Sequence, residues 1–322
     1  MMKKRMRTAI IMMTVIFLIC SSASAVLAQK KIGIILWENQ KNYTDARDGL
    51  MAQLDKEGFG ESKAIYIVED ANGSKVKAAE IVRRLASSQL DLFVAIGTTA
   101  AVAVVKEIKD VPVVFTTVYD PVDSKIAADW KSSGNNTTGT STKIHMSQLI
   151  ENLKQLKPVK SLAVLYTPGE KNSEAQLKDL QTVQAQFGIK IIPVPLTAKD
   201  EAPQILSDVV GRAEALFLSG SSIAIDALPI IIDTAKKAGV ITTAIQSDKV
   251  EKGILLGVYA NTRTLGVMAG EKAAKVLKGA KPSAIPIETV KKADVIINMK
   301  TARESRIDVP AAFLKKATRV IE

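Results

Sequence analysis

Short, continuously apolar runs alternate with longer amphipathic segments along most of this chain. Examples of the apolar runs are 31–37 (KIGIILW), 90–96 (LDLFVAI) and 161–167 (SLAVLYT). Apolar runs of this length between helical segments are typical of buried strands in parallel sheets that helices cover on both faces. The alternation therefore predicts an α/β fold. Further strands are expected at 64–68, 112–116, 189–195, 215–218, 240–245, 254–258 and 295–298, and helices at 45–56, 74–85, 99–108, 146–156, 173–187, 199–210, 223–238 and 265–277.

A polar stretch, 132–142 (SSGNNTTGTST), interrupts the alternation, which then restarts. We therefore expect two doubly wound parallel-sheet lobes joined by a crossing. Ligands of such sheets bind beyond the carboxyl ends of the strands, so a ligand cleft should lie between the lobes. The expected lobes are 29–141 plus 258–285 and 142–257 plus 286–322, with crossing strands near 139–143, 245–260 and 284–292.

The first 28 residues have the three-part layout of a secretory signal peptide. Four basic residues precede the apolar run 10–19, which is shorter than the roughly 20 residues of a membrane-spanning helix. Cleavage after Ala28 or Ala25 would place the protein in the periplasm or outside the cell, and an uncleaved membrane anchor is the alternative. Lipid anchoring at Cys20 is not expected, because Ile19 replaces the small residue usual before a lipidated cysteine.

Charge and composition argue against several classes of function. The formal charge is +11, and without the signal peptide 40 basic and 33 acidic residues remain, mixed along helices without a Lys/Arg block. Nucleic-acid binding is therefore not expected. The chain has one histidine, His145, and its one cysteine lies in the signal peptide; it has no phosphate-binding loop and no complete dinucleotide fingerprint. We therefore expect no enzyme activity, no cofactor and no metal site.

Polar or aromatic residues follow the ends of several predicted strands, where the cleft would form. Thr98 and Thr99 open a helix whose backbone N–H groups can receive a carboxylate, and Asp120 or Asp248 could pair with a ligand amino group. Each has a structural alternative, since a hydroxyl can cap its helix and Asp120 can form a turn before Pro121. The candidates at strand ends are Trp37, Thr98, Thr99, Tyr119, Asp120, Ser219, Ser221, Ser222 and Asp248.

Five stretches together carry a resemblance to a known family. They are 95–104 (AIGTTAAVAV), 111–126 (VPVVFTTVYDPVDSKI), 134–142 (GNNTTGTST), 265–288 and 295–321. In combination they resemble the substrate-binding proteins of ABC transporters, in the group that includes tryptophan- and tyrosine-binding members. The resemblance covers essentially the whole mature chain. It implies a two-lobed periplasmic-binding fold of type I, and capture of a small solute for a membrane permease driven by a separate ATPase.

The resemblance adds two further segments to the candidate pocket. One follows the first strand and contains Asn42 and Tyr43, and the other precedes the late helix and contains Asn261 and Arg263. This chain lacks the family's frequent His-Pro-x-Leu-Asp motif at the first place and Asp-Tyr-Tyr-Glu-Leu-Gly motif at the second. The loss of two tyrosines leaves open whether the ligand is an aromatic amino acid. Arg263 can receive a carboxylate or face water.

From these features we expect a monomeric, extracytoplasmic solute-binding protein. It would capture an amino acid or a similar small carboxylate by hinge closure and deliver it to the permease of an ABC importer. A sensory binding protein that presents its ligand to a membrane receptor is one alternative, and an exported enzyme on the same scaffold is another.

Overall fold

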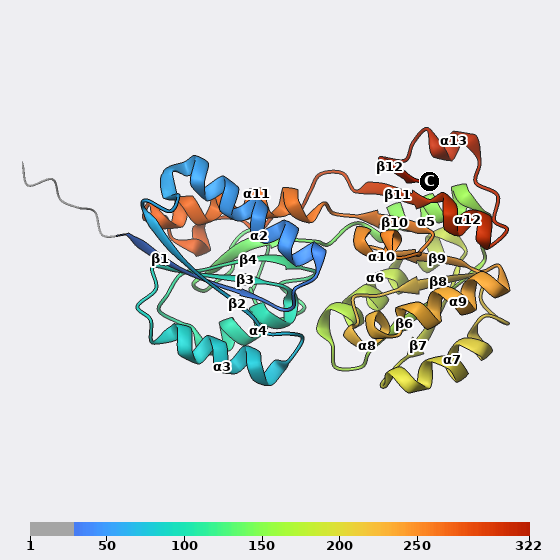
Figure 1. Ribbon diagram of the computed structural model, residues 1–322, viewed down its shortest axis with the longest axis horizontal. Coiled ribbons are helices and arrows are strands. Elements are labelled where there is room, and N and C mark those ends of the chain that lie inside the picture. Colours follow the sequence, from blue (N-terminus) through green and yellow to red (C-terminus); the bar gives the residue numbers. More distant parts are fainter. Residues whose placement is uncertain (1–28) are drawn as a thin grey trace, which may run out of the picture.

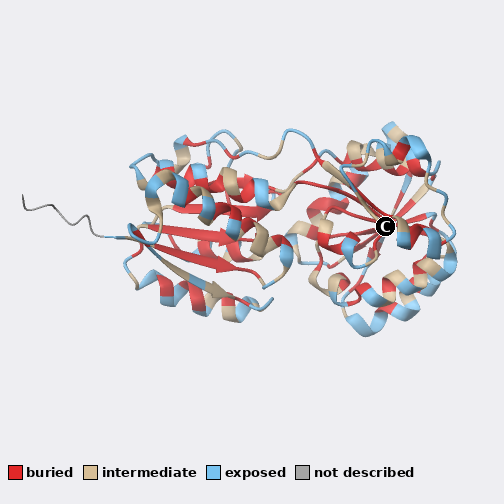
Figure 2. Ribbon diagram, turned by 45° about the horizontal axis from the view of Figure 1, so that its top comes forward, coloured by how far each residue is buried: buried red, intermediate tan, exposed pale blue. Residues whose placement is uncertain are grey.

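The computed structural model describes residues 29–322, so the predictions for the signal peptide and Cys20 lie outside the described residues. Two lobes lie side by side, each a sheet with helices on both faces (Figure 1). The central strands of both sheets are buried, the edge strands β2, β7 and β12 are partly exposed, and the outer faces of the helices are exposed (Figure 2). The predicted α/β class with two doubly wound lobes is confirmed. No helix in residues 29–322 combines the length and hydropathy needed to cross a membrane.

The first lobe is built on a five-stranded parallel sheet. Its elements are β1 (Lys30–Leu36), α2 (Lys41–Leu54) with its continuation η2 (Asp55–Phe59), β2 (Ala64–Asp70), α3 (Lys75–Ala86), β3 (Leu92–Ile96), α4 (Thr98–Glu107), β4 (Val113–Val118), β5 (Thr137–Ser141) and α11 (Thr262–Leu277). The strand order is β2-β1-β3-β4-β5. Along β1, Ile34 packs in the apolar cluster under α2 and α11, whereas Ile35 packs in the cluster under α3 and α4. Burial on both faces explains the continuous apolar run of this strand.

The second lobe is built on a seven-stranded sheet. Its elements are α5 (Met146–Leu156), β6 (Ser161–Tyr166), α6 (Lys171–Phe187), β7 (Lys190–Pro195), η3 (Lys199–Glu201), α7 (Ala202–Val209), β8 (Ala215–Leu218), α8 (Ser222–Asp226), α9 (Leu228–Ala238), β9 (Ile241–Ala244), α10 (Ser247–Glu251), β10 (Leu256–Tyr259), β11 (Asp294–Asn298), α12 (Met299–Glu304), α13 (Ala311–Leu314) and β12 (Arg319–Ile321). The order is β12-β11-β10-β9-β8-β6-β7, and β11 runs antiparallel to β10. This pairing departs from the predicted all-parallel sheet, because the chain enters β11 from the opposite lobe.

Two predicted elements differ in the structure. The polar stretch 132–142 contains the buried strand β5, because threonine is β-branched and its hydroxyls find partners. The Thr138 hydroxyl, for example, donates to the Ile285 carbonyl at 2.8 Å. The helix predicted at 223–238 is broken between α8 and α9, where Pro229 stands in the first turn of α9 and has no N–H to continue the earlier helix.

The described chain passes between the lobes three times. It leaves the first lobe between β5 and α5, returns between β10 and α11, and leaves again after the short turn η4 (Pro282–Ala284) toward β11. Figure 1 shows these segments together along one side of the gap. The strand ends of both sheets therefore face one another across a gap that is bridged on one side.

Helices α2 and α11 approach each other closely through glycines. A Cβ atom on Gly266 would lie 2.1 Å from the Ala46 carbonyl oxygen, and one on Gly49 would lie 2.3 Å from the Arg263 carbonyl oxygen. These neighbours are helical backbone, which cannot move aside as a flexible side chain can. The glycines thus allow α11, which is distant from α2 in sequence, to cover the first sheet.

We predict that Gly266→Ala destabilises the protein by about 1–3 kcal/mol, the range for overpacking a close contact. The better helix propensity of alanine offsets part of this loss, by up to about 1 kcal/mol. The shift in the urea midpoint measures the effect. Gly211→Ala is the control, because its Cβ would meet the Asp208 carbonyl oxygen at an ordinary 3.6 Å. Equal midpoints for the two variants would contradict the prediction.

Candidate functional site

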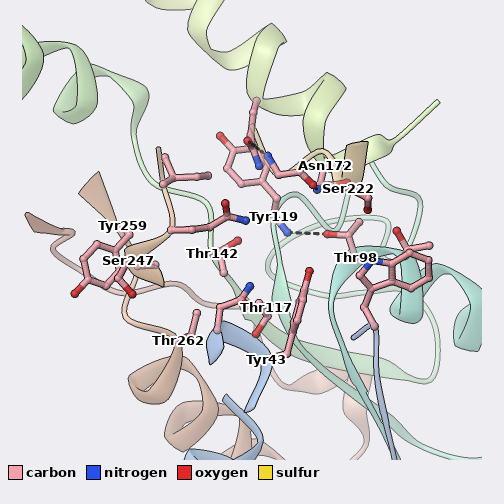
Figure 3. A pocket seen from close by; sticks show the side chains of 18 residues that line it. Tyr43, Thr98, Thr117, Tyr119, Thr142, Asn172, Ser222, Ser247, Tyr259 and Thr262 are labelled. Carbon is pink, nitrogen blue, oxygen red and sulfur yellow. Dashed lines mark hydrogen bonds between the residues drawn. The ribbon is translucent and has the colours of Figure 1, made fainter. Parts of the chain in front are cut away.

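A pocket lies between the lobes and is lined by residues from both (Figure 3). Its first-lobe residues lie at the ends of β1, β3 and β4 or at the starts of α2 and α11. Its second-lobe residues lie at the ends of β8, β9 and β10 or on α6, and two further residues lie in segments that cross between the lobes. Such a position beyond the carboxyl ends of strands is the one expected for a doubly wound sheet. The lining is Trp37, Asn42, Tyr43, Thr98, Thr99, Thr117, Tyr119, Thr142, Asn172, Gln176, Gly220, Ser222, Ile245, Gln246, Ser247, Tyr259, Ala260 and Thr262.

Four aromatic side chains form much of the apolar lining: Trp37, Tyr43, Tyr119 and Tyr259. Burial raises the pKa of Tyr43, and the nearby Glu38 carboxylate raises it further. Burial likewise raises the pKa of Tyr119 and that of Tyr259. All three phenols therefore remain protonated near neutral pH, and each is a hydrogen-bond donor as well as an apolar wall.

Three buried oxygen atoms of the lining have no hydrogen-bond partner within residues 29–322. They are Oδ1 of Asn42, Oγ1 of Thr117 and Oε1 of Gln246. An unpaired buried polar atom costs about 1–3 kcal/mol, so a ligand that donates hydrogen bonds to these atoms would recover stabilisation.

Thr117 owes its position to an irregularity in β4. The β4–β5 register shifts between Phe115 and Val118, and Thr117 has a positive φ of 58°, which is rare for a β-branched residue. A bulge of this kind re-aims a side chain, and Thr117 lines the pocket instead of the sheet. Backbone strain of this kind is often found at functional sites.

The start of α4 offers backbone donors to the pocket. Gly97 precedes it with φ of 106°, and a Cβ there would lie 2.9 Å from Cβ of Trp37, so the turn requires glycine. No side chain within residues 29–322 caps this helix, and Thr98 and Thr99 both line the pocket. The Thr98 hydroxyl instead accepts a 3.2 Å hydrogen bond from the Tyr119 backbone N–H (Figure 3). The first N–H groups of α4 are therefore available to an anion.

The start of α8 is already occupied by groups of the protein. Ser221 accepts a hydrogen bond from the Ala224 N–H at 3.0 Å, and the Ser222 N–H donates to Oε2 of Glu170 at 2.9 Å. A negative charge therefore already lies at this helix end, which disfavours a second anion there.

Two carboxylates lie beside the pocket on opposite lobes. Burial raises the pKa of Glu38, and Asp226 and Asp70 add to this effect while Lys249 opposes it. Burial also raises the pKa of Glu170, while the hydrogen bond from the Ser222 backbone N–H and the positive charge of Lys75 lower it by less. Both side chains are partly exposed.

Seven of the predicted site residues line the pocket, and six lie elsewhere. Those in the lining are Trp37, Asn42, Tyr43, Thr98, Thr99, Tyr119 and Ser222. Ser219 is buried outside the lining, and Ser221 caps α8. Asn261 caps α11 by accepting a hydrogen bond from the Thr264 N–H, and Arg263 is exposed to water.

The two predicted acidic contacts are instead paired with lysines. Oδ2 of Asp120 lies 2.7 Å from Nζ of Lys143; burial opposes ionisation, but this hydrogen bond and those from two backbone N–H groups lower the pKa of Asp120. Asp248 forms a buried ion pair with Lys249, whose Nζ also donates to Oε1 of Gln40. Each acid thus already has a lysine partner within the protein, although Oδ1 of Asp248 has no hydrogen-bond partner within residues 29–322.

Several lining residues were not among the predicted ones. Gln246 follows β9, so the strand-end rule could have found it. Asn172 and Gln176 lie one turn apart on α6 and hydrogen-bond to the backbone of Gly220, at 2.6 Å and 2.9 Å. No local sequence signal marks them, because only the packing of α6 against the end of β8 brings them to the pocket.

The amino-acid sequence matches a known protein family and a curated relative over most of its length. A family model described as ABC transporter substrate binding protein matches residues 31–321. A curated relative, the tyrosine-binding protein of Clostridioides difficile (strain R20291), is 27% identical over 277 residues, or 85% of this chain and 80% of the relative.

Two solved structures resemble this one over most of the chain. One is an ABC domain from Streptococcus pneumonia in complex with L-Trp: 26% identity, TM-score 0.86, covering 91% of this chain and 100% of that one. The other is a ligand-free, open substrate-binding protein with adhesive properties from Clostridium difficile: 28% identity, TM-score 0.74, covering 91% and 99%. These relatives are binding proteins rather than enzymes. Because the family model spans nearly all of residues 29–322, this chain belongs to the ABC transporter substrate-binding proteins.

Proposed function

We propose that this protein captures an aromatic L-amino acid between its lobes and delivers it to the membrane permease of an ABC importer. The observation that carries the proposal is the combination of four aromatic side chains with an uncapped helix start in one pocket. The relatives that bind tyrosine and tryptophan support it. Tyr119 and Tyr259 provide aromatic surface in a chain that lacks the two tyrosines of the family motif before α11.

The polar groups of the pocket suit a zwitterion in one orientation. The ligand carboxylate would accept hydrogen bonds from the N–H groups at the start of α4, since Glu170 already occupies the start of α8. The ligand ammonium group would donate to the unpartnered oxygens of Asn42 and Gln246. The side chain would then lie among the aromatic rings, where burial of apolar area supplies most of the affinity.

Hinge closure would enclose the ligand. Two observations support this: the crossing segments lie on one side of the gap, and the structure is closer to the ligand-bound relative than to the open one, although both are similarly identical in sequence. Because one chain supplies the whole lining, we propose a monomer. Substrate-binding proteins of ABC transporters act outside the cytoplasm, in agreement with the secretory signal expected at the N-terminus.

We predict that L-tryptophan, L-tyrosine or L-phenylalanine raises the melting temperature of the purified protein, while aliphatic amino acids and pentoses do not. A ligand at 100 to 1,000 times its dissociation constant should stabilise the folded state by about 3–4 kcal/mol. Calorimetry gives the stoichiometry, which should be one per chain. The proposal fails if no aromatic amino acid shifts the melting temperature and native mass spectrometry finds none bound after purification.

Replacement of Trp37 should weaken binding, whereas replacement of the other tryptophan, Trp130, should leave affinity unchanged. Trp37→Ala removes a pocket wall and should weaken binding tenfold or more, since aromatic contacts contribute roughly 0.5–1.5 kcal/mol beyond the buried area. Trp130→Ala is the control, because Trp130 packs beside the core of the first lobe and does not line the pocket. It should lower the melting temperature without changing affinity, and a similar loss of affinity in both variants would contradict the assignment.

Binding should strengthen as the pH falls from neutral into the acid range in which Glu38 and Glu170 become protonated. Glu38 and Glu170 have raised pKa values when the lobes are together, so the closed form binds more protons than a form in which water reaches them. Acid therefore favours closure, while a zwitterionic ligand does not change charge in this range. The double variant Glu38→Gln with Glu170→Gln should flatten the dependence of Kd on pH. His145→Gln should not, since His145 is exposed outside the pocket.

A further inference from the structure

Tyr119 belongs to the first lobe by sequence, yet its side chain lies in the second. It follows β4, and its ring is 1% exposed within the apolar cluster of the second lobe, beside residues such as Ile144 and Met146. The same ring lines the pocket (Figure 3). One side chain thus contacts the core of one lobe and the ligand site between both.

The Tyr119 hydroxyl is hydrogen-bonded to a charged group of the second lobe. It donates to Oδ2 of Asp179, on α6, at 2.8 Å. Nζ of Lys143, in the first crossing segment, lies 2.9 Å from the same oxygen and 2.7 Å from Oδ2 of Asp120. Lys143 also lies 5.7 Å from the centre of the Tyr119 ring. A hydrogen bond to an ionised acceptor is stronger than one between neutral groups.

The backbone of Tyr119 is held in the first lobe. Its N–H donates to the Thr98 hydroxyl at 3.2 Å, and its carbonyl accepts from the Ser141 hydroxyl at 2.5 Å. Thr98 is the first residue of α4 and lines the pocket. When the lobes separate, Tyr119 must either lose its contact with Asp179 or strain its attachment to α4.

We propose that Tyr119 is a positioning residue that couples lobe closure to completion of the pocket, through the hydrogen bond from its hydroxyl to Asp179. This inference rests on the proposed function, because it assigns a role within the same pocket. The bond favours the closed form and holds the ring as a wall of the ligand site. Two other polar contacts between the lobes are separate from Tyr119. The contact from Lys178 to Asp123 at 3.0 Å lies on the surface, with 67% and 38% of the side chains exposed, and contributes little. The contact from buried Lys249 to Gln40 at 2.7 Å involves neither Tyr119 nor Asp179.

The test uses Tyr119→Phe, which keeps the ring and removes only the hydroxyl. L-tryptophan is the probe, and its dissociation constant should rise about tenfold to a hundredfold, the effect of removing one hydrogen bond to a charged acceptor from the closed form alone. Asp179→Ala removes the acceptor and should weaken binding in the same direction. Tyr66→Phe is the matched control, because the Tyr66 hydroxyl donates to the Phe59 carbonyl at 2.6 Å within the first lobe. It should lower the melting temperature but leave affinity unchanged.

The distance between the lobes is a measurement that a general loss of stability would not change. Cys20 is the only cysteine of the chain, so Cys20→Ser gives a background without cysteine. In this background Glu80→Cys on α3 and Ser207→Cys on α7 provide one exposed spin-label site on each lobe. In Tyr119→Phe the distribution without ligand should move to longer distances, and saturating L-tryptophan should restore the closed distance. Tyr66→Phe should match the unsubstituted protein.

Two results would overturn the proposal: a distance distribution without ligand that is unchanged in Tyr119→Phe, or an affinity change in Tyr66→Phe as large as that in Tyr119→Phe. Failure of the proposed function would give a different set of results from failure of this inference. If the unsubstituted protein binds no aromatic amino acid, the distances without ligand still decide the role of Tyr119. Longer distances in Tyr119→Phe support the coupling, and equal distances refute it.

Discussion

The packing of α11 against α2 is the contact on which the two-lobed arrangement depends. Helix α11 follows β10 of the second lobe, and glycines such as Gly266 let it return and cover the first sheet at backbone contact. Because the chain must leave the first lobe, come back and leave again, three segments bridge one side of the gap. Thr142 and Ala260 lie in two of these bridges and line the pocket, so the connection that joins the lobes also contributes to the site.

The charges around the pocket are distributed so that few of them face its interior. A buried carboxylate is costly unless it is paired, and Asp120 and Asp248 are paired with Lys143 and Lys249. Glu170 sits at the start of α8, whereas no side chain within residues 29–322 caps the start of α4, whose first residues line the pocket. The pocket therefore offers neutral acceptors, backbone donors and aromatic rings, a combination that suits a zwitterion with an apolar side chain.

The fold and part of the site followed from local patterns. Apolar runs bounded by helices located the strands, and polar or aromatic residues after strand ends located Trp37, Thr98 and Tyr119 in the pocket lining. The same rule correctly placed Asp120 after the end of β4, but it could not tell whether that carboxylate contacts a ligand or a lysine. Thr117 escaped prediction because it lies inside an apolar strand, and only a bulge turns it toward the pocket.

The amino-acid sequence by itself determined the α/β class, the two series of strands and the helix starts at the strand ends, because these depend on residues that are neighbours along the chain. The tertiary structure alone decided which polar groups meet. Lys249 binds Gln40, 209 positions away, and Tyr119 places its hydroxyl on Asp179, 60 positions away in the other lobe. Such pairs depend on how two lobes are placed against each other, a property that no local periodicity encodes.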